Sequence, residues 1–163
     1  MTRATIATEL GDIEIELFTT DAPNASQNFV DLANKGYYDD VIFHRVIPGF
    51  VAQGGDGQYG KKASLERGRV GTGGPGYKFD DEPVKGEYER GAVAMANAGR
   101  DTNGSQFFIV LGDAGLPPDY SVFGRVTSGM EVADTIAAGP STGGQAGQAL
   151  EPVTMNRVTV ANP

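Results

Sequence analysis

Residues 43–55 read FHRVIPGFVAQGG, and this stretch sets Arg45 and Gln53 among apolar side chains. Successive side chains of a strand point to opposite faces, so alternation puts Arg45 on the face of Phe43 and Ile47. Burying an unpaired guanidinium is costly, so such an arginine is paired with an acid, solvated along its stem, or functional. The spacing alone leaves a structural ion pair and a functional arginine both open.

A second segment, residues 92–110, reads AVAMANAGRDTNGSQFFIV and predicts two strands joined by the turn-rich connector Gly99–Gly104. Together with the first stretch it belongs to a series of five motifs in chain order. These are FHRVIPGFVAQGG, GTGG at 71–74, MANAG at 95–99, NGSQFF at 103–108 and VFGRV at 122–126. The series closely resembles the cyclophilins, the peptidyl-prolyl cis-trans isomerases, over nearly the whole chain.

Composition agrees with this resemblance and narrows the alternatives. The chain has 163 residues, 39% of them hydrophobic, which fits one domain spanning residues 1–163. It has no cysteine, which excludes thiol nucleophiles and thiolate metal sites, and its single histidine makes a metal site improbable. The net charge of -8 argues against a nucleic-acid surface, and no apolar run reaches the roughly 20 residues of a membrane span. We expect a cytoplasmic monomer that needs no cofactor.

The N-terminal third predicts an antiparallel start followed by a helix. Alternating residues at Thr5–Leu10 and Ile13–Phe18 predict a hairpin with Gly11-Asp12 as its turn. A helix is predicted to open at Asp21 and Pro23 and to end at Gly36.

Many short strands and only two helices, without a βαβ rhythm, favour a closed antiparallel barrel. The second helix is predicted at Met130–Ala138. Further strands are predicted at Val41–Ile47, Phe50–Gln53, Ala92–Asn97, Gln106–Leu111, Ser121–Val126 and Val153–Val160. The fold class is therefore mainly β, and the resemblance implies an eight-stranded barrel with a helix closing each end.

Two loops stand out. The glycine-rich stretch Gly54–Gly76 is too long for an ordinary connection and does not match the spacing of a phosphate-binding loop. Its part Gly57–Arg69 is longer than in compact cyclophilins, and it carries the only basic cluster, Lys61, Lys62, Arg67 and Arg69. A solvated insertion is favoured over a regulatory contact. The loop Ser141–Gln148 is predicted to be an exposed connector.

The implied reaction needs a hydrogen-bond donor and no nucleophile. Rotation about an X-Pro bond must overcome a barrier of about 18–20 kcal/mol, and the twisted nitrogen becomes an acceptor only in the transition state. The resemblance assigns catalytic roles to Arg45, Gln53 and Phe50, and substrate contacts to Val51, Gly71, Ala96, Asn97, Gln106, Phe108, Leu116 and Phe123. It places Thr102, Asn103 and Gly104 on the groove rim. By alternation His44 faces away and is structural.

The segment 115–124 departs from the family pattern. Gly115 stands where many cyclophilins carry a tryptophan, and Tyr120 stands where they carry a histidine. An active isomerase of proline-containing polypeptides with weakened cyclosporin affinity is therefore expected. One alternative is a non-catalytic proline-peptide binding module or holdase, which would not require a transition-state donor such as Arg45. The absence of tryptophan from the chain argues against a third hypothesis, a barrel that binds sugars.

Overall fold

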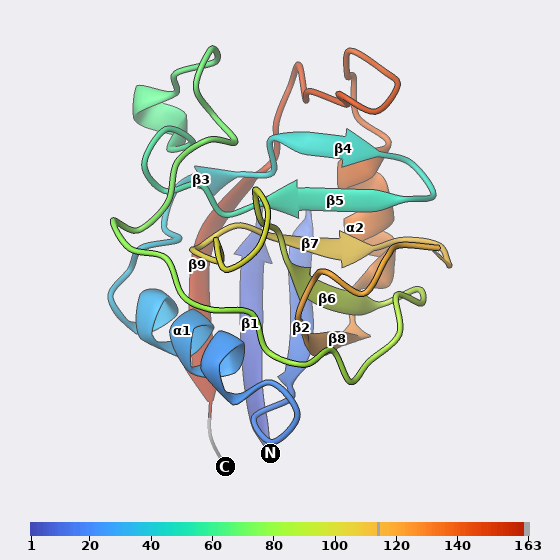
Figure 1. The fold of residues 1–163 in the computed structure, drawn as a ribbon. Helices are drawn as coiled ribbons and strands as arrows, with labels where there is room; N and C mark the ends of the chain where they lie inside the picture. Colours follow the sequence, from blue (N-terminus) through green and yellow to red (C-terminus); the bar gives the residue numbers. More distant parts are fainter. Residues whose placement is uncertain (114, 162–163) are drawn as a thin grey trace.

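The computed structural model describes residues 1–113 and 115–161 (Figure 1). The strands are β1 Thr2–Thr8, β2 Gly11–Leu17, β3 Val41–Ile42, β4 Arg45–Ile47, β5 Val51–Gly54, β6 Ala92–Met95, β7 Phe107–Val110, β8 Val122–Ser128 and β9 Thr154–Ala161. The helices are α1 Pro23–Asn34, a short 3-10 turn Lys62–Ser64, and α2 Met130–Ala137. The chain is thus mainly β with two α-helices, as the sequence predicted.

All described strand pairs are antiparallel and form one sheet in the order β3-β9-β1-β2-β8-β6-β7-β5-β4. Its two edge strands, β3 and β4, are separated by only Phe43 and His44 in the chain, so the sheet curls until its edges meet at this corner. The expectation of a closed eight-stranded barrel is corrected to a curled nine-stranded sheet. The predicted strand Val41–Ile47 breaks because β3 pairs with β9 while β4 pairs with β5.

The first hairpin turns two residues earlier than predicted. Thr8 pairs with Gly11, so Glu9 and Leu10 form the turn and Gly11 is the first residue of β2. The Thr8 hydroxyl accepts the Leu10 N–H at 3.1 Å and donates to the Gly11 carbonyl at 2.7 Å. These two bonds stabilise the turn ahead of the glycine.

Helix α1 begins at Pro23, as predicted, but Asp21 does not cap it. The carboxylate of Glu82 accepts the backbone N–H groups of Asn24 at 3.0 Å and Ala25 at 2.8 Å. A carboxylate at a helix N-terminus satisfies free amides and complements the helix dipole. The cap therefore comes from a residue far along the chain, which local sequence does not reveal.

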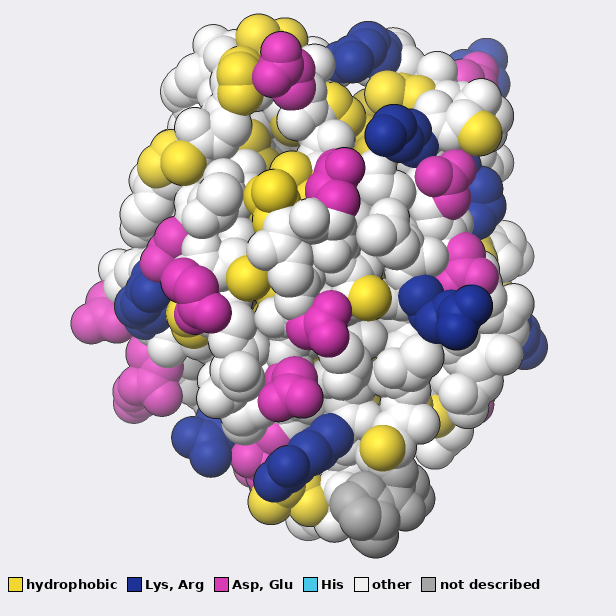
Figure 2. Space-filling view, turned by 180° about the vertical axis from the view of Figure 1, so that it is seen from behind, with side chains coloured by type: hydrophobic (Ala, Val, Ile, Leu, Met, Phe, Trp, Pro, Cys, Tyr) yellow, Lys and Arg dark blue, Asp and Glu magenta, His cyan; other side chains and the backbone are white. Residues whose placement is uncertain are grey.

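Two apolar clusters lie on opposite faces of the sheet. The main core contains the fully buried rings of Phe29, Tyr38, Phe43, Phe107 and Phe123 and is bordered by both α-helices. The second cluster lies on the other face, and its buried members are Val51, Tyr88, Ala92, Ala94, Phe108, Val110 and Val122. Seen from behind, the surface carries acidic and basic side chains interspersed with scattered apolar ones (Figure 2).

Candidate functional site

Arg45 lies in the hairpin of β4 and β5, directly opposite Gln53. Its Nη1 donates to Gln53 Oε1 at 3.2 Å, and its Nε donates to the carbonyl of Gln145 at 3.0 Å. Within the described part of the chain no carboxylate forms an ion pair with this guanidinium. The structural ion pair left open by the sequence is therefore not found, and Arg45 is oriented by neutral acceptors.

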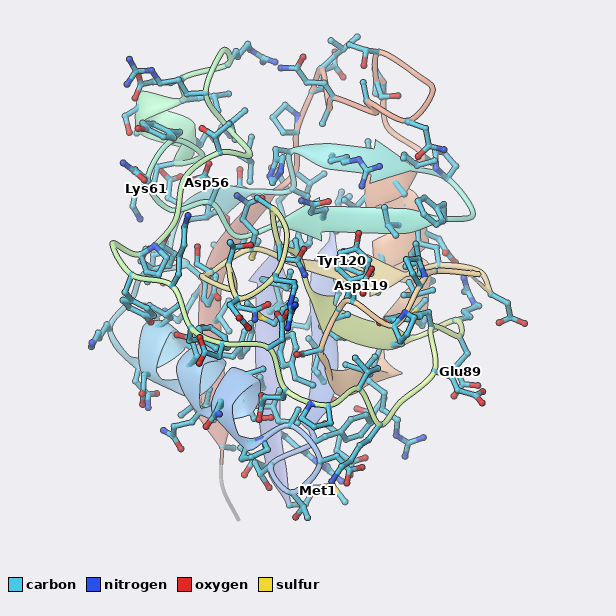
Figure 3. All side chains as sticks on the ribbon, viewed as in Figure 1. Met1, Asp56, Lys61, Glu89, Asp119 and Tyr120 are labelled. Carbon is cyan, nitrogen blue, oxygen red and sulfur yellow. The ribbon has the colours of Figure 1, made fainter. Side chains whose placement is uncertain are left out.

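Arg45 borders a cavity of about 380 Å³, whose apolar walls include Val51 and Phe108 of the second cluster. The lining residues are Arg45, Phe50, Val51, Gln53, Ala96, Asn97, Phe108, Leu116, Tyr120 and Gln145. The ring of Tyr120 meets that of Phe108 edge to face at 5.5 Å, in front of β7 (Figure 3). A guanidinium beside an apolar pocket suits an uncharged ring attached to a single polar group.

A second hollow of about 690 Å³ adjoins the first and shares Gln53, Ala96 and Asn97 with it. Gly71 and Gln106 line this second hollow, away from Arg45. The two adjoining hollows are together called the groove below. The Asn97 side-chain amide donates to the Asp119 carbonyl at 2.8 Å and so is engaged within the protein.

The structure brings most of the predicted site residues together, with Phe123 as the exception. Phe123 is fully buried in the main core, where its ring lies 5.4 Å from that of Phe29, and it does not line either hollow. Successive side chains of β8 face opposite sides, so Val122 joins the second cluster and Phe123 cannot. Of the predicted rim residues, Thr102 and Gly104 line the second hollow, while Asn103 is buried.

Two lining residues were not predicted as part of the site. Tyr120 was noted only as a departure from the family, although its position beside Phe108 makes it a wall of the cavity. Gln145 contributes its backbone carbonyl, for which no side-chain pattern exists. Residues 142–146 are exposed as predicted, but the Gly147 carbonyl accepts the Val46 N–H at 2.7 Å, so the loop is attached to β4.

His44 lies beneath the groove and outside both hollows. It is 7% exposed, and its Nδ1 has no hydrogen-bond partner among the described residues. Burial lowers the pKa of His44 from 6.5 to about 4, an effect partly offset by nearby Asp56 and reinforced by Arg45. The imidazole is therefore neutral at physiological pH and serves as packing under Gly71.

This histidine should make the fold sensitive to acid. Its folded pKa is depressed, so below pH 6.5 the unfolded chain binds the additional proton and stability falls until the pH passes the folded value near 4. Through this linkage, His44 lowers the free energy of unfolding by about 2 kcal/mol when the pH falls from about 7 to about 5. Urea unfolding at both pH values should show this loss in the native chain and a smaller loss in His44→Gln. An equal loss in both proteins would assign the acid sensitivity to other groups.

The family model for cyclophilin-type peptidyl-prolyl cis-trans isomerases matches residues 3–160. The chain belongs to this family. A peptidyl-prolyl cis-trans isomerase of Helicobacter pylori is 48% identical over 141 residues, which cover 83% of this chain and 80% of the relative. The Schizosaccharomyces pombe isomerase ppi1 is 50% identical over 135 residues, 81% of this chain and 83% of the relative.

Solved structures agree with this assignment. A cyclophilin-type isomerase of Cryptosporidium parvum, crystallised in the presence of the dipeptide Ala-Pro, matches with a TM-score of 0.84 and 33% identity over 99% of both chains. This cyclophilin is therefore a peptidyl-prolyl cis-trans isomerase with the fold of its relatives. Neither described helix is long and apolar enough to cross a membrane. No cluster of potential metal ligands occurs among the described residues.

Proposed function

We propose that this cyclophilin isomerises X-Pro bonds by donating a hydrogen bond from Arg45 to the prolyl nitrogen of the twisted amide. The observation that carries the proposal is the guanidinium itself. Its Nε and Nη1 are fixed by Gln145 and Gln53, while Nη2 has no partner among the described residues and the guanidinium borders the apolar cavity. Because the Arg45 guanidinium is already held in position, the site needs little reorganisation when the prolyl nitrogen of the substrate pyramidalises.

The apolar walls supply the complementary part of the mechanism. A proline ring in contact with Phe50, Phe108 and Leu116 is held still and withdrawn from water, and Val51 closes the floor. The amide then twists in a setting of lower polarity, where one charged hydrogen bond is stronger than in water. A millionfold acceleration requires about 8 kcal/mol, so the donor and the positioning must act together.

The remaining predicted contacts orient the peptide on either side of proline. Gln53 binds the substrate carbonyl, and the chain preceding proline follows Ala96, Asn97 and Gln106 toward Gly71. The crystallisation of the Cryptosporidium parvum relative in the presence of Ala-Pro supports a proline-containing polypeptide as substrate. Because recognition rests on the proline ring and the backbone, we propose a broad choice of residue before proline, suited to unfolded or flexible chains.

The deciding experiment is exchange NMR on a short Ala-Pro peptide, with the native chain compared with Arg45→Ala at saturating peptide. Loss of exchange with retained binding supports Arg45 as the catalytic donor. Unchanged exchange in the variant would contradict this mechanism and leave the pocket alone responsible for catalysis.

We further propose that cyclosporin binds weakly, because Gly115 stands where family members carry a tryptophan. A Cβ added at Gly115 meets nothing within 4 Å among the described residues, so the backbone there leaves room for a side chain to begin. Gly115→Trp is expected to tighten cyclosporin binding at least about tenfold, since a buried aromatic face and an indole donor contribute more than 1.4 kcal/mol. Turnover should stay within about twofold of native, because this position lies away from the rotating bond. Inhibition of the native chain by stoichiometric nanomolar drug would contradict the proposal.

We propose that the protein works as a cytoplasmic monomer without nucleic-acid or membrane partners and assists protein folding. The absence of cysteine and the net charge of -8 support this view. Size-exclusion chromatography with light scattering tests the monomeric state.

A further inference from the structure

Asp56 is a buried carboxylate whose four hydrogen bonds all come from backbone N–H groups. It is fully buried, and Oδ1 accepts the amides of Gln58 and Tyr59, each at 3.0 Å. Oδ2 accepts the amides of Gly71 at 2.8 Å and Gly73 at 3.0 Å. Among the described residues no lysine or arginine forms an ion pair with it. Such a carboxylate determines the path of the backbone that supplies its donors.

The glycines of the GTGG motif allow this close approach. A Cβ on Gly73 would lie 2.4 Å from Asp56 Oδ1, and one on Gly71 would lie 3.2 Å from His44 Nε2. Gly71 also has a φ of +99°, a conformation that other residues rarely adopt. In this segment the amides of Gly71 and Gly73 face Asp56, and the carbonyls of the same two glycines, on either side of Thr72, are left to accept other donors.

Those carbonyls hold the side chain of Gln106. Its Nε2 donates to the Gly71 carbonyl at 2.9 Å and to the Gly73 carbonyl at 3.0 Å. Its Oε1 accepts from Gln53 Nε2 at 3.2 Å, and Gln53 Oε1 accepts from Arg45 Nη1 at 3.2 Å. The contacts thus run without interruption from the buried carboxylate to the guanidinium.

Only one orientation of the Gln53 and Gln106 side-chain amides allows every hydrogen bond of this series to form. A guanidinium can only donate, so Gln53 must present its oxygen to Arg45 and its nitrogen to Gln106. Gln106 must then present its nitrogen to two acceptors, which are the carbonyls held in place by Asp56. If those carbonyls move, Gln106 loses both acceptors and the amide series loses its fixed orientation.

We infer that Asp56 is a positioning residue for catalysis, which fixes the Arg45 guanidinium through the GTGG backbone, Gln106 and Gln53. The inference rests on the proposed role of Arg45. Asp56 lies apart from Tyr120, which lines the smaller hollow (Figure 3), so its effect should fall on turnover and not on capture of the proline ring.

Asp56→Asn is the principal variant, because its amide places an NH₂ donor against two backbone donors in either orientation. We expect kcat for an Ala-Pro peptide to fall roughly tenfold or more, because a small misplacement of a catalytic group is costly, and KM to change by a smaller factor than kcat. The side-chain Nε–H resonance of Arg45 should shift in the same variant. A loop-stabilising role alone would not move this resonance.

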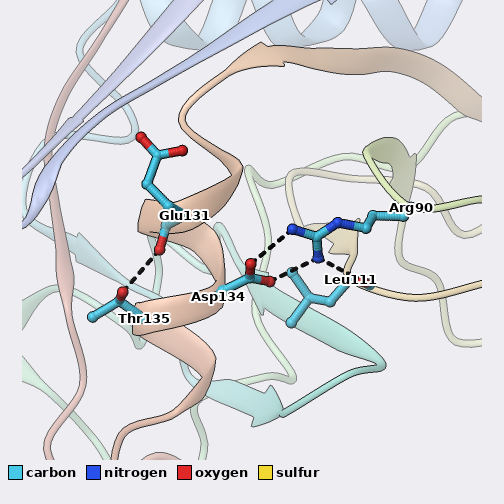
Figure 4. Close-up of polar contacts among 5 residues, drawn as sticks. All are labelled: Arg90, Leu111, Glu131, Asp134 and Thr135. Carbon is cyan, nitrogen blue, oxygen red and sulfur yellow. Dashed lines mark hydrogen bonds and ion pairs between the residues drawn. The ribbon is translucent and has the colours of Figure 1, made fainter.

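Asp134→Asn is the matched control. Asp134 is likewise a hydrogen-bonded carboxylate, which accepts from Arg90 Nη1 at 2.8 Å and Nη2 at 2.7 Å, but it lies on α2 and takes no part in the series (Figure 4). This control should keep native kcat and the native Arg45 resonance.

A double-mutant cycle with Gln106→Leu decides whether Asp56 acts through the glutamines. Once Gln106→Leu has broken the series, Asp56→Asn should lower kcat no further. If Asp56→Asn does not fold, Gly73→Ala replaces it, because the new Cβ displaces the segment while leaving the carboxylate intact.

The inference is overturned by a folded Asp56→Asn with native kcat, or by reductions in kcat that multiply in the double variant. If Gly73→Ala is used, native kcat there has the same meaning. Arg45→Ala in the same assay separates the two claims. Native turnover in Arg45→Ala contradicts the proposed function, whereas slow turnover there with native turnover in Asp56→Asn overturns only the positioning role.

Discussion

Arg45→Ala is expected to lower kcat for an Ala-Pro peptide at least about a hundredfold, while the dissociation constant of the peptide changes less than about threefold. A hundredfold loss corresponds to about 2.7 kcal/mol, which is the range of one charged hydrogen bond made only in the transition state. Binding is kept because the planar amide nitrogen of the bound peptide accepts no hydrogen bond. NMR exchange at saturating peptide measures turnover, and titration of the same samples measures affinity.

Arg45→Lys is the matched control for charge. The ammonium keeps the positive charge but lacks the fork that contacts Gln145 and Gln53 while a third nitrogen remains available. We expect its turnover to lie between those of the native chain and the alanine variant. An alanine variant that retains more than about a tenth of native kcat would contradict a transition-state donor of this strength.

The sequence predicted only part of the surroundings of Arg45. Its pairing with Gln53 is local, but the prediction that Phe43 shares its face was wrong, because the chain passes from β3 to β4 between them and Phe43 packs in the main core. Arg45 and Gln53 lie in one hairpin, so the alternation that places them on one face also makes them neighbours. The break between β3 and β4 was not predicted, since it depends on pairing of Val41 and Ile42 with the C-terminal strand β9. Local patterns carry no information about such a distant partner.

The same reasoning explains why Phe123 was predicted to contact substrate although it lies in the main core, and why Gln145 was missed. Phe123 and Phe108 are both aromatic residues in strands, but their side chains point to opposite faces of the sheet. Only the face that carries Phe108 borders the cavity. Gln145 acts through its backbone, which every residue possesses, so composition gives no sign of it. The amide series from Asp56 to Arg45 joins three separate segments and emerges only in three dimensions.

Phe107 and Phe108 offer a direct test of the two faces of β7, because they are adjacent in sequence and chemically identical. Phe107 is fully buried in the main core, where its ring lies 5.4 Å from Phe29, 5.7 Å from Tyr38 and 6.4 Å from Phe43. Phe108 is 5% exposed and borders the cavity beside Tyr120. Removing either ring takes away similar apolar area, but only the loss of the Phe107 ring leaves an enclosed cavity in the core.

Phe107→Ala is therefore expected to lower the free energy of unfolding by about 3–5 kcal/mol, since three surrounding rings cannot collapse into the space. Phe107→Leu should lose less than about 2 kcal/mol, because most of the volume is kept. Phe108→Ala should lose less stability than Phe107→Ala and should instead weaken peptide binding. Urea unfolding, with the midpoint and slope analysed together, measures each loss. Equal destabilisation by the two alanine variants, with peptide affinity unchanged in both, would mean that Phe108 is a core residue and that the proline ring binds elsewhere.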